Sequence, residues 1–303
     1  MPIQVPPISR RRFLAGSLAA GAGLVLPKRL PAAEVPTDPN RFALLSDTHI
    51  REHRDRDNRG IKPAEKLAAA REEILALAPR PAAMLICGDC AYNEGTPGDY
   101  AVLAEEVRPI REAGIPIWFV MGNHDNLENF YRAFPDARPR GAPPLPGEHV
   151  AVVKTPHADW VLLDSLQRSN HTPGRIGEAQ LKWLAETLEA NPKRPALVMA
   201  HHNPDRRPKP SGLVDTEALF KVLSPRRRAK AFLYGHSHCW NRGKMPDGLH
   251  LVNLPTLVWV FDKTQPRGWV DARLQPGGIA LTLSALDKTH PRHEQKFELK
   301  WRV

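Results

Sequence analysis

The sequence predicts an α/β fold, a single-domain αββα sandwich made of two sheets. Two observations lead to this prediction. Up to Tyr234, short apolar runs typical of buried strands alternate with amphipathic helical segments. Beyond Trp240 the pattern changes to strands separated by turns. At 303 residues, with 42% apolar and 25% charged residues, the chain is long enough for one large domain with its own core, and it shows no internal repeat or heptad pattern.

The first 33 residues are set aside from the fold because they resemble a twin-arginine export signal. The segment Ser9–Leu14 supplies the pair Arg10 and Arg11, and an uncharged stretch rich in Ala, Gly and Leu follows it up to Leu26. That stretch is shorter than the roughly 20 apolar residues that span a bilayer. A basic, disordered amino terminus is the alternative. We therefore expect the twin-arginine translocase to carry the protein to the periplasm or out of the cell, with residues 34–303 as the mature domain.

The charge of the chain favours anionic substrates. The formal net charge is +10, and the leader holds five of these positive charges and no acid, which leaves +5 for the mature chain. A moderately basic surface attracts anions over a long range. No nucleic-acid module accompanies it, so we expect a small phosphate ester substrate and no stable nucleic-acid partner. The sequence does not indicate the oligomeric state.

Five predicted strands end in polar residues that packing does not require. In order along the chain, Arg41–Ser46 precedes Asp47-Thr48-His49, Ala83–Cys87 precedes Gly88-Asp89, Ile115–Met121 precedes Gly122-Asn123-His124-Asp125, Ala196–Ala200 precedes His201-His202, and Ala231–Tyr234 precedes Gly235-His236-Ser237-His238. In open α/β sheets ligands are held at the carboxyl ends of the strands. Five such ends in one chain indicate a single site.

The connecting segments read as helices and loops. Helical spacing of apolar residues predicts helices at Pro63–Ala78, Pro97–Ala113, Asn126–Phe134, Gly177–Ala190 and Asp215–Leu223. The charged run 51–62 and the proline-rich runs 135–147 and 203–212 are predicted to be loops. Further strands are predicted at Val150–Lys154, Trp160–Asp164, Leu249–Leu254, Leu257–Phe261, Trp269–Leu274, Ile279–Ala285 and Phe297–Trp301.

The ordered set D-x-H, G-D, G-N-H-D, H and G-H-x-H, which runs from Asp47 to His238, resembles the calcineurin-like metallophosphoesterase superfamily. The resemblance implies the same two-sheet sandwich and a pair of metal ions. One ion would be held by Asp47, His49, Asp89 and His238, and the other by Asp89, Asn123, His201 and His236. Nitrogen and oxygen ligands without thiolate suit Mn, Fe, Zn or Co. Two such ions roughly 3.5–4 Å apart generate hydroxide near neutral pH and neutralise charge as it attacks a phosphate ester.

The remaining polar residues receive roles toward the substrate. His124 is predicted to stabilise the developing charge and protonate the leaving oxygen, Asp125 to orient and charge that imidazole, and Asn123 to help position a phosphoryl oxygen. His202 is expected behind the ligands or facing the substrate. Candidate substrate arginines are Arg51, Arg54 and Arg206.

Tyr92 distinguishes two branches of the superfamily. The run Gly88-Asp89-Cys90-Ala91-Tyr92 is similar to the purple acid phosphatase pattern G-D-x-x-Y, in which the tyrosine binds iron. Here the first motif keeps His49 for that coordination position, so Tyr92 is predicted to be a wall of the site. The D-x-H form is similar to the branch that contains cyclic-nucleotide and glycerophosphodiester phosphodiesterases.

We therefore expect a dinuclear metal-dependent phosphohydrolase that cleaves phosphodiesters in preference to phosphomonoesters. An acid-phosphatase-like phosphomonoesterase, a non-catalytic scaffold of the same fold and a nuclease are the alternatives. Any single histidine could be a hydrogen-bonded core residue, but the whole set would be a costly unpaired cluster without metal. The three cysteines are expected to be small buried residues, and a Cys90–Cys239 disulfide is the alternative.

Overall fold

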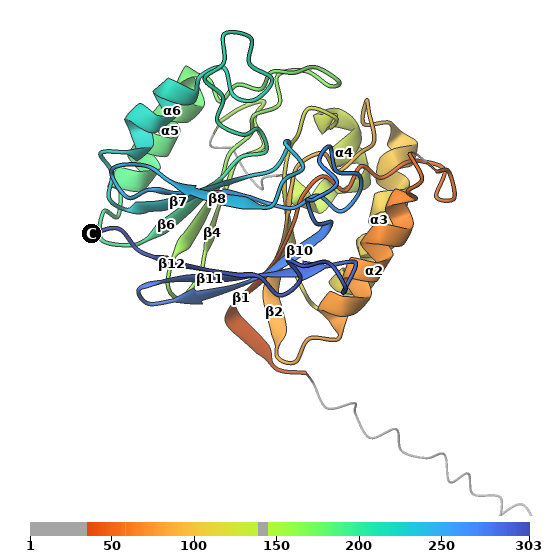
Figure 1. Ribbon diagram of the computed structural model, residues 1–303. Coiled ribbons are helices and arrows are strands. Elements are labelled where there is room, and N and C mark those ends of the chain that lie inside the picture. The colour runs from red at the N-terminus through yellow and green to blue at the C-terminus, as the bar shows by residue number, and fades with distance from the viewer. Residues whose placement is uncertain (1–34, 58, 139–144) are drawn as a thin grey trace, which may run out of the picture. The chain divides into compact units, whose positions relative to one another are not determined.

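Two six-stranded mixed sheets form the centre of the protein in the computed structural model, which describes residues 35–57, 59–138 and 145–303. The strand order is β12-β11-β10-β1-β2-β3 in the first sheet and β4-β5-β6-β7-β9-β8 in the second. Helices cover the outer faces of both sheets (Figure 1). The predicted two-sheet α/β sandwich is therefore confirmed. The predicted export signal lies outside the described residues.

The first sheet is assembled from both ends of the chain. Its strands are β1 (Thr37–Leu45), β2 (Arg80–Cys87), β3 (Ile117–Val120), β10 (Gly268–Gln275), β11 (Gly278–Ala285) and β12 (Lys296–Lys300). Strands β1, β2 and β3 are parallel, and β10 pairs antiparallel with β1. Its helical partners are α2 (Pro63–Leu75), α3 (Pro97–Glu112) and α4 (Leu127–Ala133), followed by the short helix η1 (Pro135–Ala137).

The second sheet comes from the middle of the chain. Its strands are β4 (Ala151–Lys154), β5 (Asp159–Leu162), β6 (Ala196–Met199), β7 (Ala229–Tyr234), β8 (Asn241–Lys244) and β9 (His250–Asn253). Strands β5, β6, β7 and β9 run parallel to one another. The helices α5 (Glu178–Glu189) and α6 (Thr216–Leu223) pack on its outer face. The parallel strands of both sheets thus bring their carboxyl ends to one edge.

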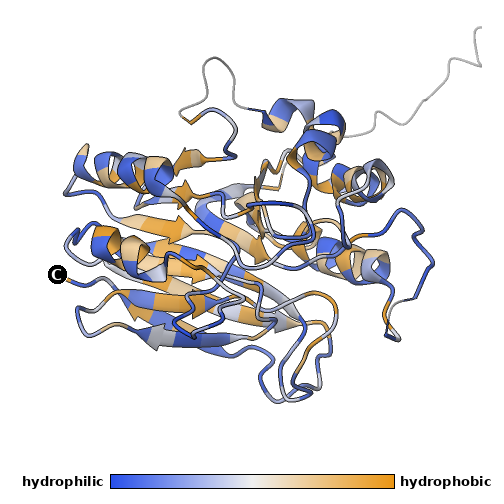
Figure 2. Ribbon diagram, turned by 90° about the horizontal axis from the view of Figure 1, so that it is seen from above, coloured by the Kyte–Doolittle hydropathy of each residue, from blue (hydrophilic) through white to orange (hydrophobic). Residues whose placement is uncertain are grey.

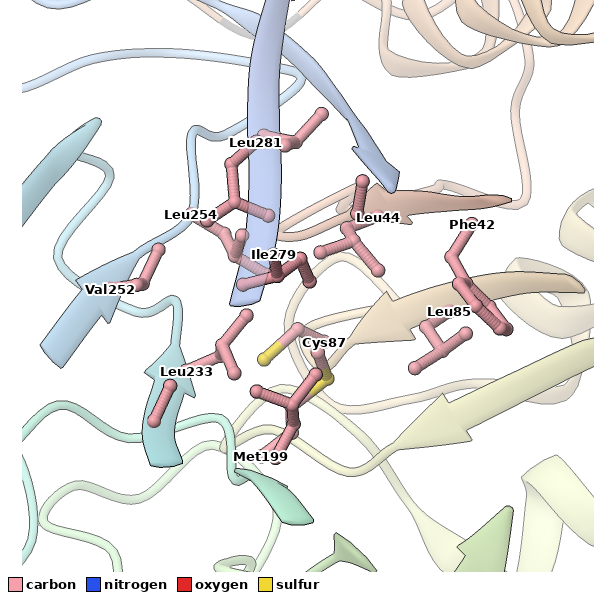
Figure 3. Packing of buried hydrophobic residues seen from close by; sticks show 14 of the residues in the cluster. Phe42, Leu44, Leu85, Cys87, Met199, Leu233, Val252, Leu254, Ile279 and Leu281 are labelled. Carbon is pink, nitrogen blue, oxygen red and sulfur yellow. The ribbon is translucent and has the colours of Figure 1, made fainter. Parts of the chain in front are cut away.

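Strand periodicity explains why the sheets pack face to face. In β1, Phe42 and Leu44 point into the core between the sheets, whereas Ala43 and Leu45 face the helices. Figure 3 shows Leu44 and residues of both sheets meeting in that central core. The strands are accordingly mostly apolar, while the helices carry mixed faces (Figure 2). Among the described residues, no helix has both the length and the apolar character needed to cross a membrane.

One predicted strand is absent from the structure, and one observed strand was not predicted. The segment predicted as a strand at Leu257–Phe261 is a loop, because its first residue instead donates from N to the carbonyl of Ser46 (3.3 Å) and packs beneath the end of β1. Strand β8 was not predicted, since all four of its residues are exposed and none is a strong strand former. The three cysteines are free, so the alternative of a Cys90–Cys239 disulfide is wrong.

Candidate metal centre

Five strand ends from the two sheets meet in one cluster. The first sheet contributes side chains that follow β1, β2 and β3, and the second contributes side chains that follow β6 and β7. Backbone hydrogen bonds join the loops, from Asp47 N to Gly88 O (3.1 Å) and from Gly235 N to His201 O (2.9 Å). The predicted ligands gathered here are Asp47, His49, Asp89, His201, His236 and His238. The seventh predicted ligand, Asn123, is buried in the loop after β3.

The Asp and His side chains form three overlapping groups that could hold a metal ion. The first is Asp47, His49 and His238, in which His238 Nε2 is 3.3 Å from both Asp47 Oδ1 and His49 Nε2. In the second group Asp89 lies with His201 and His236, and in the third it lies with His49 and His124. Asp89 Oδ2 is 3.2 Å from His201 Nε2 and 3.7 Å from His49 Nε2. The Asp89 carboxylate therefore belongs to two of the three groups, as a ligand shared by two ions would.

The backbone fixes how the imidazoles face the cluster. The Nδ1 atoms of His201 and His238 lie 2.8 Å and 2.6 Å from the carbonyls of Cys87 and Trp259. His49 Nδ1 is 3.3 Å from the carbonyl of Tyr92. A carbonyl only accepts, so each Nδ1 carries the hydrogen and each Nε2 presents a lone pair to the cluster. This is the tautomer that binds a metal through Nε2.

Several buried polar atoms in the cluster lack a partner among the described residues. They are Asp47 Oδ1, Asn123 Oδ1, His201 Nε2 and His202 Nε2. Leaving such atoms unsatisfied in a buried site is unfavourable. Bound cations would satisfy Asp47, Asn123 and His201 together. The nitrogen and oxygen donor set therefore fits a pair of transition metal ions.

The ionisation states agree with metal binding. Burial by itself raises the pKa of Asp47, but the neighbouring His238 and His201 hold that pKa at about 2. Burial lowers the pKa of His49 to about 3 and that of His236 to about 4. Burial opposes protonation of His201 as well, yet the nearby Asp89 charge raises its pKa to about 9. The cluster thus combines anionic carboxylates with neutral imidazoles at His49 and His236, and at His201 a bound cation would take the place of the proton on Nε2.

The ligand loops adopt a strained backbone. Of the eight non-glycine residues with positive φ in the described part of the chain, five are predicted ligands. They are Asp47, His49, Asp89, His236 and His238, with φ between 44° and 65°. The left-handed conformation costs an L-residue about 1–2 kcal/mol. Strain of this kind concentrates at functional sites, where it sets the direction of side chains.

Two motif glycines are explained by ligands of the neighbouring loop. A Cβ on Gly122 would collide with the carboxylate and backbone nitrogen of Asp89. A Cβ on Gly235 would lie 2.6 Å from Asp47 Oδ2 and would also meet the Ser46 hydroxyl. Neither glycine is required for its own flexibility, since neither has a positive φ. Each leaves room for a carboxylate ligand that crosses in front of it.

His124 stands at the edge of the cluster, but its predicted partner is elsewhere. Its Nδ1 lies 2.9 Å from the Asn93 carbonyl, and its ring centre is 5.3 Å from that of His49. The prediction that Asp125 orients this imidazole is wrong. The Asp125 carboxylate turns inward and accepts from Gly122 N (2.9 Å) and from two further backbone nitrogens. Sequence reasoning missed Asn93, because a backbone carbonyl leaves no mark on residue type.

Asp125 holds the loop that carries His124 rather than the imidazole itself. Besides Gly122 N, it accepts from Cys90 N and Ala91 N, both at 3.1 Å, in the loop after β2. It also accepts from the Tyr100 hydroxyl on α3 at 3.0 Å. Asp125 is fully buried. Its carboxylate therefore ties the loop that carries His124 to the loop that carries Asp89.

The other predicted substrate residues occupy different positions. His202 is fully buried, with Nδ1 2.8 Å from Ser165 Oγ and its ring 4.7 Å from that of His236. It lies behind the ligands rather than facing a substrate. Arg51 lies over the ring of Tyr92, with its guanidinium carbon 3.9 Å from the ring centre.

The two other candidate arginines are engaged in ion pairs. Arg54 pairs with Glu105 (2.8 Å) and Glu106 (2.9 Å). Arg206 pairs with Glu217. Sequence reasoning also missed Trp259, whose ring centre is 4.5 Å from that of His49 and 6.2 Å from that of Tyr92. Its apolar surroundings suggested a strand instead of a wall of the site.

Comparisons with known proteins point to one family. A family model for calcineurin-like phosphoesterases matches residues 40–240. A probable cyclic nucleotide phosphodiesterase of Rhodopseudomonas palustris is 32% identical over 206 residues, which cover 65% of this chain and 71% of that protein. A cAMP/cGMP dual specificity phosphodiesterase of Mycobacterium tuberculosis is 31% identical over 219 residues, which cover 69% of this chain and 65% of that protein. A solved dimetal phosphatase from Danio rerio has the same fold, with a TM-score of 0.64 at 15% identity over 87% of this chain and 100% of that one.

Proposed function

Because the chain belongs to the calcineurin-like phosphoesterase family and is a phosphoric ester hydrolase, we propose that it cleaves phosphodiesters with the help of two metal ions. The observation that carries this proposal is the cluster of Asp47, His49, Asp89, His201, His236 and His238, with His124 within reach of His49 and Asp89. The relatives named as cyclic nucleotide phosphodiesterases support the diester preference.

The described side chains divide between the two ions. Asp47, His49 and His238 would hold one, His201, His236 and the unpartnered Asn123 Oδ1 would hold the other, and Asp89 would belong to both. A pair of transition metal ions supplies Lewis acidity and lowers the pKa of bound water. The surrounding backbone carbonyls hold His49, His201 and His238 in the tautomer that leaves Nε2 for a metal ion.

His124 is the group that meets the leaving alcohol. The Asn93 carbonyl, 2.9 Å from Nδ1, keeps a hydrogen on that nitrogen, so it is Nε2, in the imidazolium form of the ring, that would give its proton to the departing oxygen. The backbone nitrogen of His124 donates to Asp89 Oδ1 at 2.9 Å. This hydrogen bond fixes the Asp89 carboxylate and the loop that carries His124 to each other.

Turnover of bis-p-nitrophenyl phosphate and of p-nitrophenyl phosphate, measured side by side with added Mn²⁺, tests the proposal. We expect the diester to be hydrolysed faster and chelation to abolish activity. The change His124→Ala should lower kcat by about 10²–10⁴-fold while metal content stays at two ions per chain. Activity on the monoester alone would refute the diester preference, and equal rates for wild type and His124→Ala would indicate a scaffold without turnover.

We further propose that the protein acts in the periplasm or outside the cell after export by the twin-arginine translocase. The support is the Ser9–Leu14 motif of the sequence. Replacing both Arg10 and Arg11 with lysine should retain the protein in the cytoplasm, as measured by cell fractionation. Unchanged export of that variant would refute the proposal.

A further inference from the structure

Three aromatic side chains, Tyr92, Trp259 and Phe261, border the metal centre and are called the aromatic rim here. The Phe261 ring is stacked on the ligand His238, with ring centres 4.7 Å apart and an interplanar angle of 26°. The Trp259 ring lies 4.5 Å from that of the ligand His49 and 5.8 Å from that of His238. Aromatic rings therefore touch the ligands that the first sheet and β7 supply to one ion.

The exposure of Phe261 is larger than support of His238 requires. The residue is 67% exposed and is one of three large apolar residues exposed among those that the structure describes, the others being Val214 and the terminal Val303. One face of the ring covers His238, while most of the residue remains open to solvent. Exposed aromatic surface next to a polar site is a typical binding surface for a flat apolar group.

Two guanidinium groups accompany the rim. Arg51 lies 3.9 Å from the centre of the Tyr92 ring, and Arg59 lies 5.6 Å from that of Trp259. Within the described residues neither arginine has a carboxylate within 4.0 Å, in contrast to Arg54. Their N–H groups are thus available to oxygen and nitrogen acceptors at the edge of a bound ring. Aromatic faces combined with arginine are the surface on which nucleobases stack.

Resting on the proposed phosphodiesterase function, we infer that the aromatic rim is a subsite for a nucleobase, so that the preferred substrates are nucleotide phosphodiesters. The phosphate would lie at the metal centre, and the base would stack on the open side of Phe261 beside Trp259. In this arrangement the sugar would lie between the aromatic rim and the metal centre, since both rings touch predicted ligands. Arg51 and Arg59 would hydrogen-bond the acceptor atoms of the base.

A binding experiment tests the inference without turnover. Adenosine 5′-monophosphate and ribose 5-phosphate carry the same phosphate and sugar and differ in the base. Calorimetry with the full chain loaded with Mn²⁺ should show about tenfold tighter binding of the nucleotide, as expected for one stacked base. This ratio should approach one in Phe261→Ala and persist in Phe261→Tyr, which keeps the ring.

Turnover provides the second measurement. In Phe261→Ala, kcat/KM for adenosine 3′,5′-cyclic phosphate should fall about tenfold relative to kcat/KM for glycerophosphoethanolamine, a phosphodiester without a ring. Equal affinity of wild type for the two monophosphates, or an equal loss of kcat/KM on both diesters in the variant, would overturn the inference and leave the phosphodiesterase proposal intact. Tight nucleotide binding without hydrolysis of either diester would overturn the proposed function and support the subsite.

Discussion

The buried hydroxyl of Tyr100 links helix α3 to the loop that carries His124, called the catalytic loop from here on. Removing this hydroxyl should lower both the stability and the activity of the protein. The hydroxyl donates to Asp125 Oδ1 at 3.0 Å and accepts from Asn126 N at 2.7 Å. Tyr100 is fully buried, and burial raises the pKa of its hydroxyl, so it remains a donor. In Tyr100→Phe, a hydrogen bond to a buried carboxylate is lost and the Asn126 N–H loses its acceptor.

The magnitude follows from these two contacts. A hydrogen bond to a charged group contributes about 1.5–3 kcal/mol, and an unsatisfied buried donor costs about 1–3 kcal/mol. Since the contributions overlap, we expect Tyr100→Phe to lower the unfolding free energy by about 2–4 kcal/mol in urea denaturation. A misplacement of His124 should also lower kcat on bis-p-nitrophenyl phosphate by about tenfold or more.

Tyr131→Phe is the matched control. Its hydroxyl lies 2.8 Å from His149 Nδ1, in a pair of a half-buried tyrosine and a buried histidine that contains no predicted site residue. We expect a loss of about 1 kcal/mol and unchanged kcat. If Tyr100→Phe were as stable and as active as wild type, or if both variants lost kcat equally, the claim that Asp125 and Tyr100 position the catalytic loop would be wrong.

Three further predictions follow from other contacts. In Gly122→Ala the new methyl group would displace Asp89, so the metal content measured by mass spectrometry should fall below two ions per chain. The control Gly277→Ala, where nothing lies within 4 Å of the new methyl group, should retain both ions, and two ions per chain in Gly122→Ala would contradict the prediction. The Arg302 side chain is 3% exposed and donates to backbone carbonyls and to a carboxylate. Arg302→Met should therefore lower the unfolding free energy by about 3–5 kcal/mol, and a loss below about 1 kcal/mol would disprove this prediction. Burial raises the pKa of Asp164 from 3.8 to about 7, so between these values the folded state keeps a proton that the unfolded state releases. The unfolding free energy should therefore decline by up to about 4 kcal/mol as the pH rises from about 4 to about 7. Asp164→Asn should remove this decline, and an unchanged pH profile in that variant would contradict the prediction.

The clustering of the predicted ligand residues could be predicted because strand ends are recognisable from residue order. Asp47 and His238 each follow an apolar run, and parallel strands bring such ends to one edge. The partners of the Asp125 carboxylate could not be predicted, because its oxygens accept from backbone N–H groups of a loop more than thirty residues away in the sequence. The loop at Leu257–Phe261 was mistaken for a strand because it is rich in β-branched and aromatic residues, but Leu257 and Val258 are buried without pairing in a sheet and Phe261 is exposed.

The division of the ligands between the two sheets has a consequence for folding. Asp47 and Asp89 belong to one layer and His201 and His236 to the other, so an occupied centre would act as a clasp across the interface. A ligand that binds only the assembled state adds about 4 kcal/mol at a thousandfold excess over its Kd. The stability of the interface between the two sheets thus depends on the metal concentration in the compartment where the chain folds.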